Sequence, residues 1–576
     1  MNNYKIEYER WLTSNTLTDE ELAELKTIKD NEDEIKVRFS SDISFGTAGL
    51  RSTMCLGTAN MNRFTVAQTT KAIAALIKSQ NAEKRGVVIA FDSRNNSALF
   101  ANVSAGILAA EGVKVYLFDA LRPTPELSFA VRHLGAIAGI NITASHNPKE
   151  YNGYKAYWED GAQISPDQAA AISELRSEFD ILDLSNIMSV DDGKKSGMIV
   201  LLDELFDSIY LEAVRKTAVC PENISKVSND LKVVYTPLHG AGYKLVPRVF
   251  KESGLLHLYT VDEQMVSDGD FPTVKKPNPE YPETFKLGID LADRVGSDIV
   301  IATDPDADRV GVMARSKDGS FVTISGNQMG ALLLDYVIKQ RKERGTLASN
   351  AYCVKSIVST DMAYKIADVN GIKLHDVLTG FKFIGEVIKN YEKRGDEDGF
   401  ILGFEESYGY LLGSYARDKD AVEASMMILE MTAYYKMNDM TLIDALNNLY
   451  LNYGFYSEKM IDVYMEGVNG VENRKKVMSG LRNNIPSAIG GCPVKSVGDY
   501  IEGCFTNLSD GVKTPTDQPV SDVIYYILEN DDKIIVRPSG TEPKIKIYIL
   551  AHGESMDIIS SKSAKYESDI RKITEV

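Results

Sequence analysis

Three carboxylates lie within five residues of one another in Asp304-Pro-Asp306-Ala-Asp308, and an arginine follows at position 309. Like charges this close raise the cost of ionising one another, and a cation would remove that cost. Hard divalent cations such as Mg²⁺ and Ca²⁺ prefer oxygen ligands of this kind. An EF-hand is excluded because the sixth position is arginine where glycine is needed, and the twelfth is Arg315 where glutamate is needed. Alone, the motif indicates equally a metal site or a solvated acidic turn.

A second polar run, Thr143-Ala-Ser145-His146-Asn-Pro148, offers a serine hydroxyl that could act as a nucleophile. No G-x-S-x-G elbow surrounds Ser145. Because His146 is the adjacent residue, we expect its side chain to diverge from Ser145, which weakens a Ser–His dyad. Taken alone, the run favours a turn in which serine and asparagine bond to local backbone groups.

A third run, Gly403–Gly409, places a carboxylate and a hydroxyl two residues apart, at Glu405 and Ser407. Such a pair can bind the vicinal hydroxyl groups of a sugar. A glutamate pair at Glu405 and Glu406 is equally ordinary on a solvated surface. This run therefore indicates a sugar-binding loop only in combination with other motifs.

A fourth run, Arg537-Pro-Ser-Gly-Thr-Glu-Pro543, combines an arginine, two hydroxyl groups and a glycine that frees backbone N–H groups. This composition is typical of a phosphate-binding nest. Lys544 and Lys546 add positive charge beside it. A plain Pro/Gly-rich hairpin turn is the less favoured reading, because so many anion donors coincide. Together, the four runs indicate phosphoryl transfer on a phosphorylated sugar.

Apolar stretches that predict short buried strands precede the first three chemical runs. Ala136–Ile142 precedes the Ser145 run, Asp298–Ala302 precedes the carboxylates, and Phe400–Phe404 precedes Glu405. Segments with apolar residues at helical spacing alternate with these strands. This alternation predicts mostly parallel sheets covered on both faces, and ligands bind at the carboxyl ends of such strands.

The last hundred residues differ, because short predicted strands at 523–528, 533–536 and 544–550 are joined by tight turns. We therefore predict an α/β protein with three successive mixed, mostly parallel α/β sheet domains and a C-terminal α+β domain around a central cleft. The expected boundaries are 1–205 for the domain with the serine loop, 206–320 for the metal loop, 321–450 for the sugar loop and 451–576 for the phosphate loop.

Composition is that of an ordinary globular protein, with 44% hydrophobic and 25% charged residues in 576. The formal net charge of -18 argues against nucleic acid as a main partner but not against small anionic substrates. Five cysteines without C-x-x-C spacing predict reduced thiols. No signal peptide or membrane span is recognised, so we expect a cytoplasmic protein with no membrane partner.

In combination, these motifs resemble the α-D-phosphohexomutase family, which includes phosphoglucomutases and phosphomannomutases. The resemblance runs from Phe45-Gly-Thr-Ala-Gly-Leu-Arg51 to the Arg537 run, and Asn152-Gly-Tyr-Lys-Ala-Tyr-Trp158 is most similar to its longer branch, which also includes phosphopentomutases. It implies an isomerase that interconverts α-D-glucose 1-phosphate and glucose 6-phosphate through a phosphoserine and glucose 1,6-bisphosphate, with Mg²⁺ as cofactor. Pentose and mannose phosphates remain alternative substrates, and a monomer or small homo-oligomer is expected.

The resemblance also implies residue roles. Ser145 would be the phosphoserine and a metal ligand beside Asp304, Asp306 and Asp308. The catalytic residues around the transferring group would be Ser145, His146, Lys155, Arg309 and Arg51. The substrate-binding residues would be Thr379, Glu405, Ser407, Lys419, Arg537, Ser539, Gly540 and Thr541. The general base is left open between His146 and Lys155.

Two positions depart from the usual family pattern. Pro305 stands where many members have glycine, which stiffens the metal loop without removing a ligand. Tyr408 separates Ser407 from Gly409, where many members have serine followed directly by glycine. The second departure lies in the sugar loop, so the choice between hexose and pentose stays open.

Overall fold

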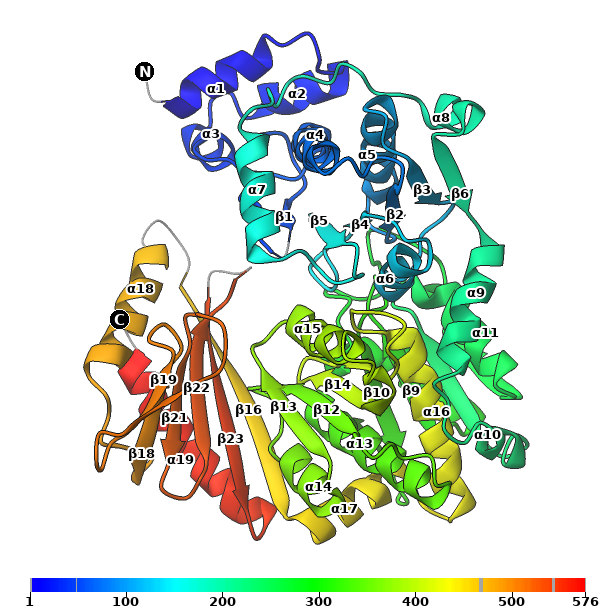
Figure 1. Cartoon of the computed structure of the whole chain (residues 1–576), viewed down its shortest axis with the longest axis vertical. Helices are drawn as coiled ribbons and strands as arrows, with labels where there is room; N and C mark the ends of the chain where they lie inside the picture. Colours follow the sequence, from blue (N-terminus) through cyan, green and yellow to red (C-terminus); the bar gives the residue numbers. More distant parts are fainter. Residues whose placement is uncertain (1–2, 48, 466–469, 541–543, 575–576) are drawn as a thin grey trace. The chain divides into compact units, whose positions relative to one another are not determined.

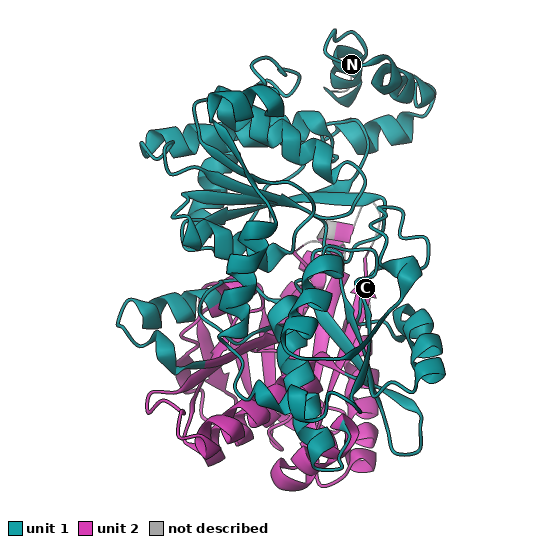
Figure 2. Ribbon diagram, turned by 90° about the vertical axis from the view of Figure 1, so that its right-hand side faces the viewer, with its two compact units in different colours: residues 1–324, 385–400, 408–441 teal, residues 325–384, 401–407, 442–576 magenta. Residues whose placement is uncertain are grey.

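The computed structural model describes residues 3–47, 49–465, 470–540 and 544–574. Its chain divides into two compact units, shown in teal and magenta in Figure 2. Unit 1 holds residues 1–324, 385–400 and 408–441, and unit 2 holds residues 325–384, 401–407 and 442–576.

The first sheet of unit 1 has six strands in the order β1-β5-β4-β2-β3-β6 (Figure 1). The pairs β4–β2, β2–β3 and β3–β6 are parallel, whereas β5 runs antiparallel to both β4 and β1. Its strands are β1 (Leu50–Thr53), β2 (Val87–Phe91), β3 (Val115–Phe118), β4 (Ala138–Ile142), β5 (Tyr151–Trp158) and β6 (Ile199–Leu202). Its helices are α4 (Arg63–Ser79), α5 (Ser97–Ala110), α6 (Thr124–His133), α7 (Pro166–Arg176) and α8 (Val190–Ser196).

Apolar side chains explain why these strands form the core of this sheet. Val87, Ile89, Ile140 and Ile142 are all fully buried or nearly so, as expected for strands covered on both faces. The chain passes from β2 to β3 toward one edge of the sheet, and then from β3 back past β2 to β4. Because crossovers between parallel strands are right-handed, these opposite directions place α5 and α6 on opposite faces.

The second sheet of unit 1 has five strands in the order β11-β10-β9-β7-β8. The pairs β9–β7 and β7–β8 are parallel, and β10 is antiparallel to β9 and β11. Its strands are β7 (Lys232–Thr236), β8 (His257–Thr260), β9 (Ile299–Thr303), β10 (Val310–Arg315) and β11 (Phe321–Ile324). Its helices are α9 (Glu204–Arg215), α10 (Glu222–Lys226), α11 (Gly242–Glu252), η1 (Asp262–Gln264), η2 (Pro282–Phe285) and α12 (Lys286–Val295).

Three N-terminal helices pack around the fully buried Trp11, in a small core that Leu56, Phe64, Ile181 and Leu182 complete. They are α1 (Asn3–Leu12), α2 (Asp19–Thr27) and α3 (Glu32–Phe39). Later segments of the chain complete unit 1. They contain η3 (Glu397–Gly399), β15 (Gly409–Leu411) and α16 (Ala421–Met437), and most of α15 (Phe381–Glu392).

Unit 2 contains a parallel pair, β12 (Tyr352–Ser356) with β13 (Lys373–Val377), and β14 (Phe400–Glu405) lies on the other side of β12. Its terminal sheet is antiparallel, in the order β16-β23-β22-β21-β18-β19-β20. Its further strands are β16 (Phe455–Tyr464), β17 (Ala488–Ile489), β18 (Cys492–Asp499), β19 (Cys504–Asn507), β20 (Lys513–Pro515), β21 (Ile524–Leu528), β22 (Lys533–Pro538) and β23 (Lys544–Gly553). Its helices are α13 (Gly326–Glu343), α14 (Met362–Asn370), α17 (Leu442–Tyr453), α18 (Gly470–Asn483) and α19 (Met556–Thr574).

The expected fold class is confirmed: α/β sheets come first, and a sheet-rich α+β region ends the chain. The antiparallel strands β1, β5 and β10 were not predicted. The four domain boundaries and the central cleft stay predictions. None of the five cysteines is in a disulfide. Within the described ranges, every helix is too short or too polar to cross a membrane.

Candidate active site

Ser145 follows β4 in a tight turn and adopts a left-handed backbone with φ of +52°. Its side chain is buried, and its hydroxyl donates to Asp304 Oδ2 at 2.8 Å. The expectation that His146 diverges from it is wrong, because His146 Nδ1 lies 3.1 Å from Ser145 Oγ. The positive φ changes the direction of the chain between the two residues, so neighbouring side chains face each other.

The three carboxylates of the metal loop are buried at the carboxyl end of β9. One oxygen from each of Asp304, Asp306 and Asp308 lies within 4.8 Å of the others, which is the spacing needed to share one ion. Asp304 Oδ1 accepts the backbone N–H groups of Asp308 at 3.1 Å and Arg309 at 3.0 Å. These bonds close the loop, with Ala307 in a left-handed conformation at φ of +50°.

Two oxygens of this cluster have no hydrogen-bond partner, namely Asp306 Oδ1 and Asp308 Oδ1. Both are buried, and a buried unpaired carboxylate oxygen is costly. Three carboxylates with two open oxygens, on a loop already closed by its own backbone, form the donor set that a hard divalent cation prefers. The residues present therefore fit Mg²⁺.

Two lysines from distant segments partly neutralise the cluster. Lys155 on β5 has its Nζ 2.7 Å from Asp306 Oδ2 and 3.4 Å from Asp308 Oδ2. Lys419, which precedes α16, has its Nζ 3.2 Å from Asp308 Oδ2. A side chain at Gly409 would collide with the stem of Lys419, since a Cβ there would lie 2.1 Å from its Cδ. Gly409 thus leaves the space through which Lys419 reaches the cluster.

The electrostatics of the loop follow from burial and from these pairs. Burial, reinforced by the charges of Asp306 and Asp308, raises the pKa of Asp304 well above its ordinary value. Burial opposes ionisation of Asp306 too, but Lys155 outweighs it and lowers the Asp306 pKa. Burial works against the charged form of Lys155, but the charges of Asp306 and Asp308 outweigh it and raise the Lys155 pKa. Lys155 is therefore a cation here, and the three carboxylates carry more negative charge than the cluster tolerates alone.

The two arginines expected at the site belong to unit 1 and are both tied to polar partners. Arg51 on β1 donates from Nη1 to Asn147 Oδ1 at 3.3 Å. Arg309 pairs with Glu280 at 2.5 Å and lies 3.9 Å from Asp308. Unit 1 thus contains the serine, the histidine and the three carboxylates. It also contains four cationic side chains, which come from four segments of the sequence.

The expected sugar-binding residues lie in unit 2, around the end of β14. Glu405 Oε1 accepts the backbone N–H of Gly380 at 2.7 Å, which links the Thr379 turn to the end of β14. Thr379 Oγ1 is buried without a hydrogen-bond partner. Ser407 is half-buried two residues beyond Glu405. This turn therefore presents a carboxylate and hydroxyl groups together.

The expected phosphate loop follows β22 in unit 2. Arg537 donates to the Tyr548 hydroxyl at 3.0 Å, and the Ser539 N–H bonds to the Lys544 carbonyl at 2.8 Å. Burial lowers the pKa of Lys546, and the charge of Arg537 lowers it further. Like charges gathered in this way favour an anion. Gly540 has open space around its Cα, and Thr541 lies outside the described residues.

Sequence reasoning missed three residues that support the site. Thr124, the first residue of α6, donates to Asp306 Oδ2 at 2.8 Å. Asp92 and Arg94 follow β2 and contact the serine loop. The carboxyl end of β2 was a signal that could have found the last two, since ligand loops collect at that edge of the sheet.

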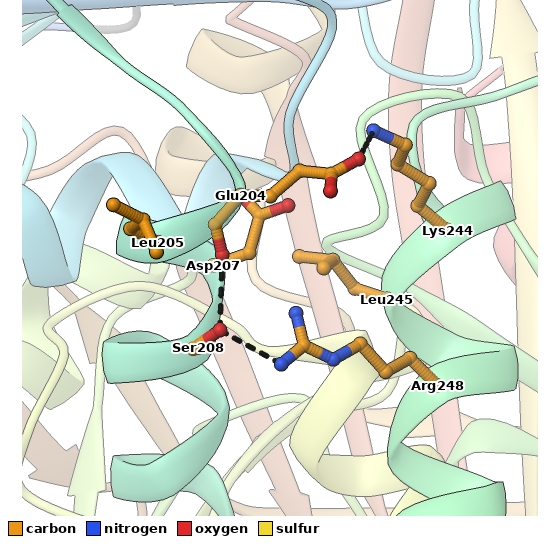
Figure 3. A pocket seen from close by; sticks show the side chains of 7 residues that line it. All are labelled: Glu204, Leu205, Asp207, Ser208, Lys244, Leu245 and Arg248. Atoms are coloured by element: carbon orange, nitrogen blue, oxygen red, sulfur yellow. Dashed lines mark hydrogen bonds and ion pairs between the residues drawn. The ribbon is translucent and has the colours of Figure 1, made fainter.

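A cavity of about 420 Å³ lies between α9 and α11 (Figure 3). Its basic side chains are already bonded, Lys244 to Glu204 at 2.8 Å and Arg248 to Ser208 at 2.8 Å. Its lining residues are Glu204, Leu205, Asp207, Ser208, Lys244, Leu245 and Arg248. None of the expected site residues is among them.

Three family models match consecutive parts of the chain. They describe the α/β/α domains I, II and III of phosphoglucomutase/phosphomannomutase and match residues 42–179, 208–318 and 325–453. A phosphoglucomutase of Staphylococcus epidermidis is 36% identical over 523 residues, which cover 91% of this chain and 93% of that protein. One from Staphylococcus saprophyticus is 36% identical over 545 residues, covering 94% and 96%.

Solved structures show the same fold at lower identity. Parafusin, a phosphoglucomutase from Paramecium in its open form, matches with a TM-score of 0.67 and 18% identity, over 93% of this chain and 95% of that one. A phosphoglucomutase/phosphomannomutase family protein from Burkholderia thailandensis matches with a TM-score of 0.65 and 19% identity, over 92% and 98%.

Proposed function

The chain belongs to the α-D-phosphohexomutase family, and we propose that it is a phosphoglucomutase that interconverts α-D-glucose 1-phosphate and glucose 6-phosphate. The observation that carries the proposal is the buried Ser145 hydroxyl, 2.8 Å from a carboxylate of a three-aspartate cluster. A serine nucleophile beside three aspartates that can bind a divalent metal ion provides the groups that phosphoryl transfer requires. Similarity to phosphoglucomutases over nine-tenths of the chain supports this substrate class.

Ser145 would carry the phosphoryl group. The P–Oγ bond of phosphorylated Ser145 breaks as a bond forms between phosphorus and the free hydroxyl oxygen of the hexose monophosphate. The proton of that hydroxyl needs an acceptor within hydrogen-bond reach. Lys155 is unsuited because its raised pKa keeps it protonated. His146, with Nδ1 3.1 Å from Ser145 Oγ, is the better candidate, because it can take this proton and pass it to the departing Ser145 Oγ.

Asp304, Asp306, Asp308 and phosphorylated Ser145 would hold Mg²⁺, which when bound supplies positive charge that offsets the charge of the transferring group. The chain's own cations serve the same purpose. Lys155 and Lys419 lie at the cluster, and Arg51 and Arg309 would complete the shell around the phosphoryl group. Positioning and charge neutralisation supply most of the catalysis in reactions of this type.

The intermediate would be glucose 1,6-bisphosphate, which returns its other phosphate to Ser145. The substrate therefore binds in two opposed orientations, and its recognition must suit both. In unit 2, Glu405, Ser407 and Thr379 would form hydrogen bonds with sugar hydroxyl groups that both orientations present. Arg537, Ser539, Gly540 and Thr541 would bind the phosphate that is not being transferred.

The decisive test is Ser145→Ala, with turnover of glucose 1-phosphate followed in the presence of glucose 1,6-bisphosphate. We expect turnover to fall to background and phosphoserine to disappear from the mass spectrum. Ser79→Ala, at the exposed end of α4, is a matched control that keeps full activity. Full activity of Ser145→Ala would exclude the covalent step. Parallel assays with ribose 1-phosphate and mannose 1-phosphate decide between this substrate and the two alternatives.

A further inference from the structure

Arg94 is a buried arginine that binds the backbone of the serine loop from behind. Its side chain is fully buried. Its Nη2 donates to the carbonyls of Ser145 at 2.6 Å and Asn147 at 2.5 Å, and its Nη1 donates to those of Pro148 at 2.8 Å and Tyr151 at 3.0 Å. One guanidinium group therefore fixes four carbonyls within seven residues, from the serine to the start of β5.

Asp92 fixes the other side of the same turn through a threonine. Its Oδ2 lies 3.3 Å from Arg94 Nε and accepts the hydroxyl proton of Thr143 at 2.6 Å. Thr143 Oγ1 in turn accepts the backbone N–H of Ser145 at 2.8 Å. Asp92 Oδ1 accepts from the Arg94 N–H at 2.9 Å and from Ser97 Oγ at 2.8 Å, so the carboxylate is itself held firmly.

These contacts hold Ser145 at its N–H and its C=O, on either side of the strained φ of +52°. A left-handed conformation is unfavourable for a serine and persists only where the surroundings determine it. The conformation is also what brings Ser145 Oγ to Asp304 and His146 Nδ1 to Ser145 Oγ. The direction of the nucleophile thus depends on the groups that hold its backbone.

We propose that Arg94, backed by Asp92 and acting with Thr143, is a positioning residue that keeps Ser145 left-handed so that its hydroxyl faces the aspartate cluster. The proposal rests on the proposed function, because it concerns how Ser145 takes and gives the phosphoryl group. It adds a group that touches neither substrate nor the reacting atoms. Arg94 acts through the loop backbone, whose carbonyls it binds.

Two substitutions test the proposal from opposite sides of the turn. Arg94→Lys keeps the charge but cannot reach four carbonyls, and Thr143→Val removes the acceptor of the Ser145 N–H. We expect kcat to fall about 100-fold in each, the loss typical of a misplaced reacting group, with KM largely unchanged. Thr143→Ser keeps the hydroxyl and should recover most of the kcat that Thr143→Val loses.

Arg315→Lys is the matched control. Arg315 also donates to three backbone carbonyls, those of Ser297, Gly319 and Ala292, but it ends β10, roughly 16 Å along that strand from the metal loop. We expect its kcat to equal that of the wild type. A comparable loss of kcat in Arg315→Lys would mean that general loosening explains the Arg94 result, and would overturn the proposal.

Amide hydrogen exchange of the peptide that covers residues 144–147 gives a readout independent of activity. We expect faster exchange there in Arg94→Lys and Thr143→Val, and unchanged exchange in Arg315→Lys. Wild-type exchange together with wild-type kcat per folded molecule would overturn the proposal. If Arg94→Lys does not fold, the Thr143 pair decides. Turnover by Ser145→Ala would instead refute the proposed function, and the exchange result would still report on the loop.

Discussion

Two buried ion networks, one in each unit, have different charge balances. In unit 1, three carboxylates at Asp304, Asp306 and Asp308 meet the ammonium groups of two lysines, Lys155 and Lys419. The three carboxylates outnumber the two ammonium groups. The nearby Arg309 lies 3.9 Å from Asp308 but makes its shorter ion pair with Glu280, a carboxylate outside the cluster.

In unit 2, two lysines meet two carboxylates. Lys355 Nζ is fully buried on β12, 2.9 Å from Asp376 Oδ1 and 3.7 Å from Asp361 Oδ1. Lys533 on β22 lies 2.7 Å from the other oxygen of Asp361. Lys355 also donates to the Ser359 carbonyl at 3.1 Å. This network ties the β12–β13 pair to the terminal sheet with no excess of either charge.

The difference in charge balance distinguishes a structural ion network from a functional one. A balanced buried network needs nothing further, and removing one member leaves a buried charge unpaired. An unbalanced one is incomplete without a ligand of the missing charge, and perturbed groups of this kind gather at functional sites. We therefore expect mutations in the two networks to change different properties, stability in unit 2 and turnover in unit 1.

The largest expected effect is on stability, in Lys355→Met. The substitution removes a fully buried cation and leaves the half-buried Asp376 and Asp361 with one partner fewer. Breaking a buried ion pair in this way typically costs about 3–5 kcal/mol. Urea denaturation followed by circular dichroism measures the loss. Lys495→Met is the control, because that lysine forms an exposed pair with Asp531 that contributes about 0–1 kcal/mol. Equal stability of the two variants would show that the network in unit 2 is not structural.

Asp306→Asn is the counterpart in unit 1. Replacing one of the two carboxylates with an open oxygen lowers the affinity for Mg²⁺ and weakens stabilisation of the transferring group. We expect kcat to fall roughly 100- to 1000-fold, the range found when one electrostatic group of an active site is removed. Titration calorimetry with Mg²⁺ should show weaker binding, while the urea midpoint changes little. A kcat within tenfold of the wild type would contradict the assignment.

Arg537→Gln tests a third charge pattern, the cation excess around the phosphate loop in unit 2. Loss of one charge-assisted hydrogen bond costs about 1.5–3 kcal/mol, so we expect KM to rise by roughly 10- to 100-fold. Because this arginine would hold the phosphate that is not transferred, kcat should change less than KM. Arg571→Gln, on the exposed surface of α19, is the control. A fall confined to kcat would place Arg537 at the reacting phosphate instead.

The ends of the strands could be predicted from the sequence, because apolar runs stop abruptly before polar residues. The serine loop and the metal loop each follow such a strand end and were predicted with it. The antiparallel strand β5 was missed, since polar residues such as Asn152 and Lys155 interrupt its apolar pattern. The backbone angle of Ser145 could not be read from residue types, so the His146 contact was missed. The ion pairs of Lys355, which lies within an apolar strand, could not be predicted, because the partner carboxylates come from separate segments of the chain.

The smallest expected effect concerns Glu458 on β16, whose titration changes the charge balance of the network in unit 2. Burial and the charge of Asp361 raise the pKa of Glu458 to about 7, although the hydrogen bond from Thr360 and the charge of Lys355 oppose the rise. Below pH 7 it is neutral and the network stays balanced. Above pH 7 it adds a carboxylate, which gives this network the same kind of imbalance as the metal loop.

The sign of the effect on stability follows from the pKa values in the two states. The folded-state pKa exceeds the ordinary 4.5, so folding favours the protonated form. This contribution is fully present below pH 4.5 and is lost as the pH rises through 7. Since Glu458 is half-buried, we expect a loss of only about 1 kcal/mol. Urea midpoints at pH 5 and pH 8 should differ less in Glu458→Gln than in the wild type. An identical pH dependence would mean that Glu458 is ionised throughout and that the network in unit 2 tolerates the same excess of negative charge as the metal loop.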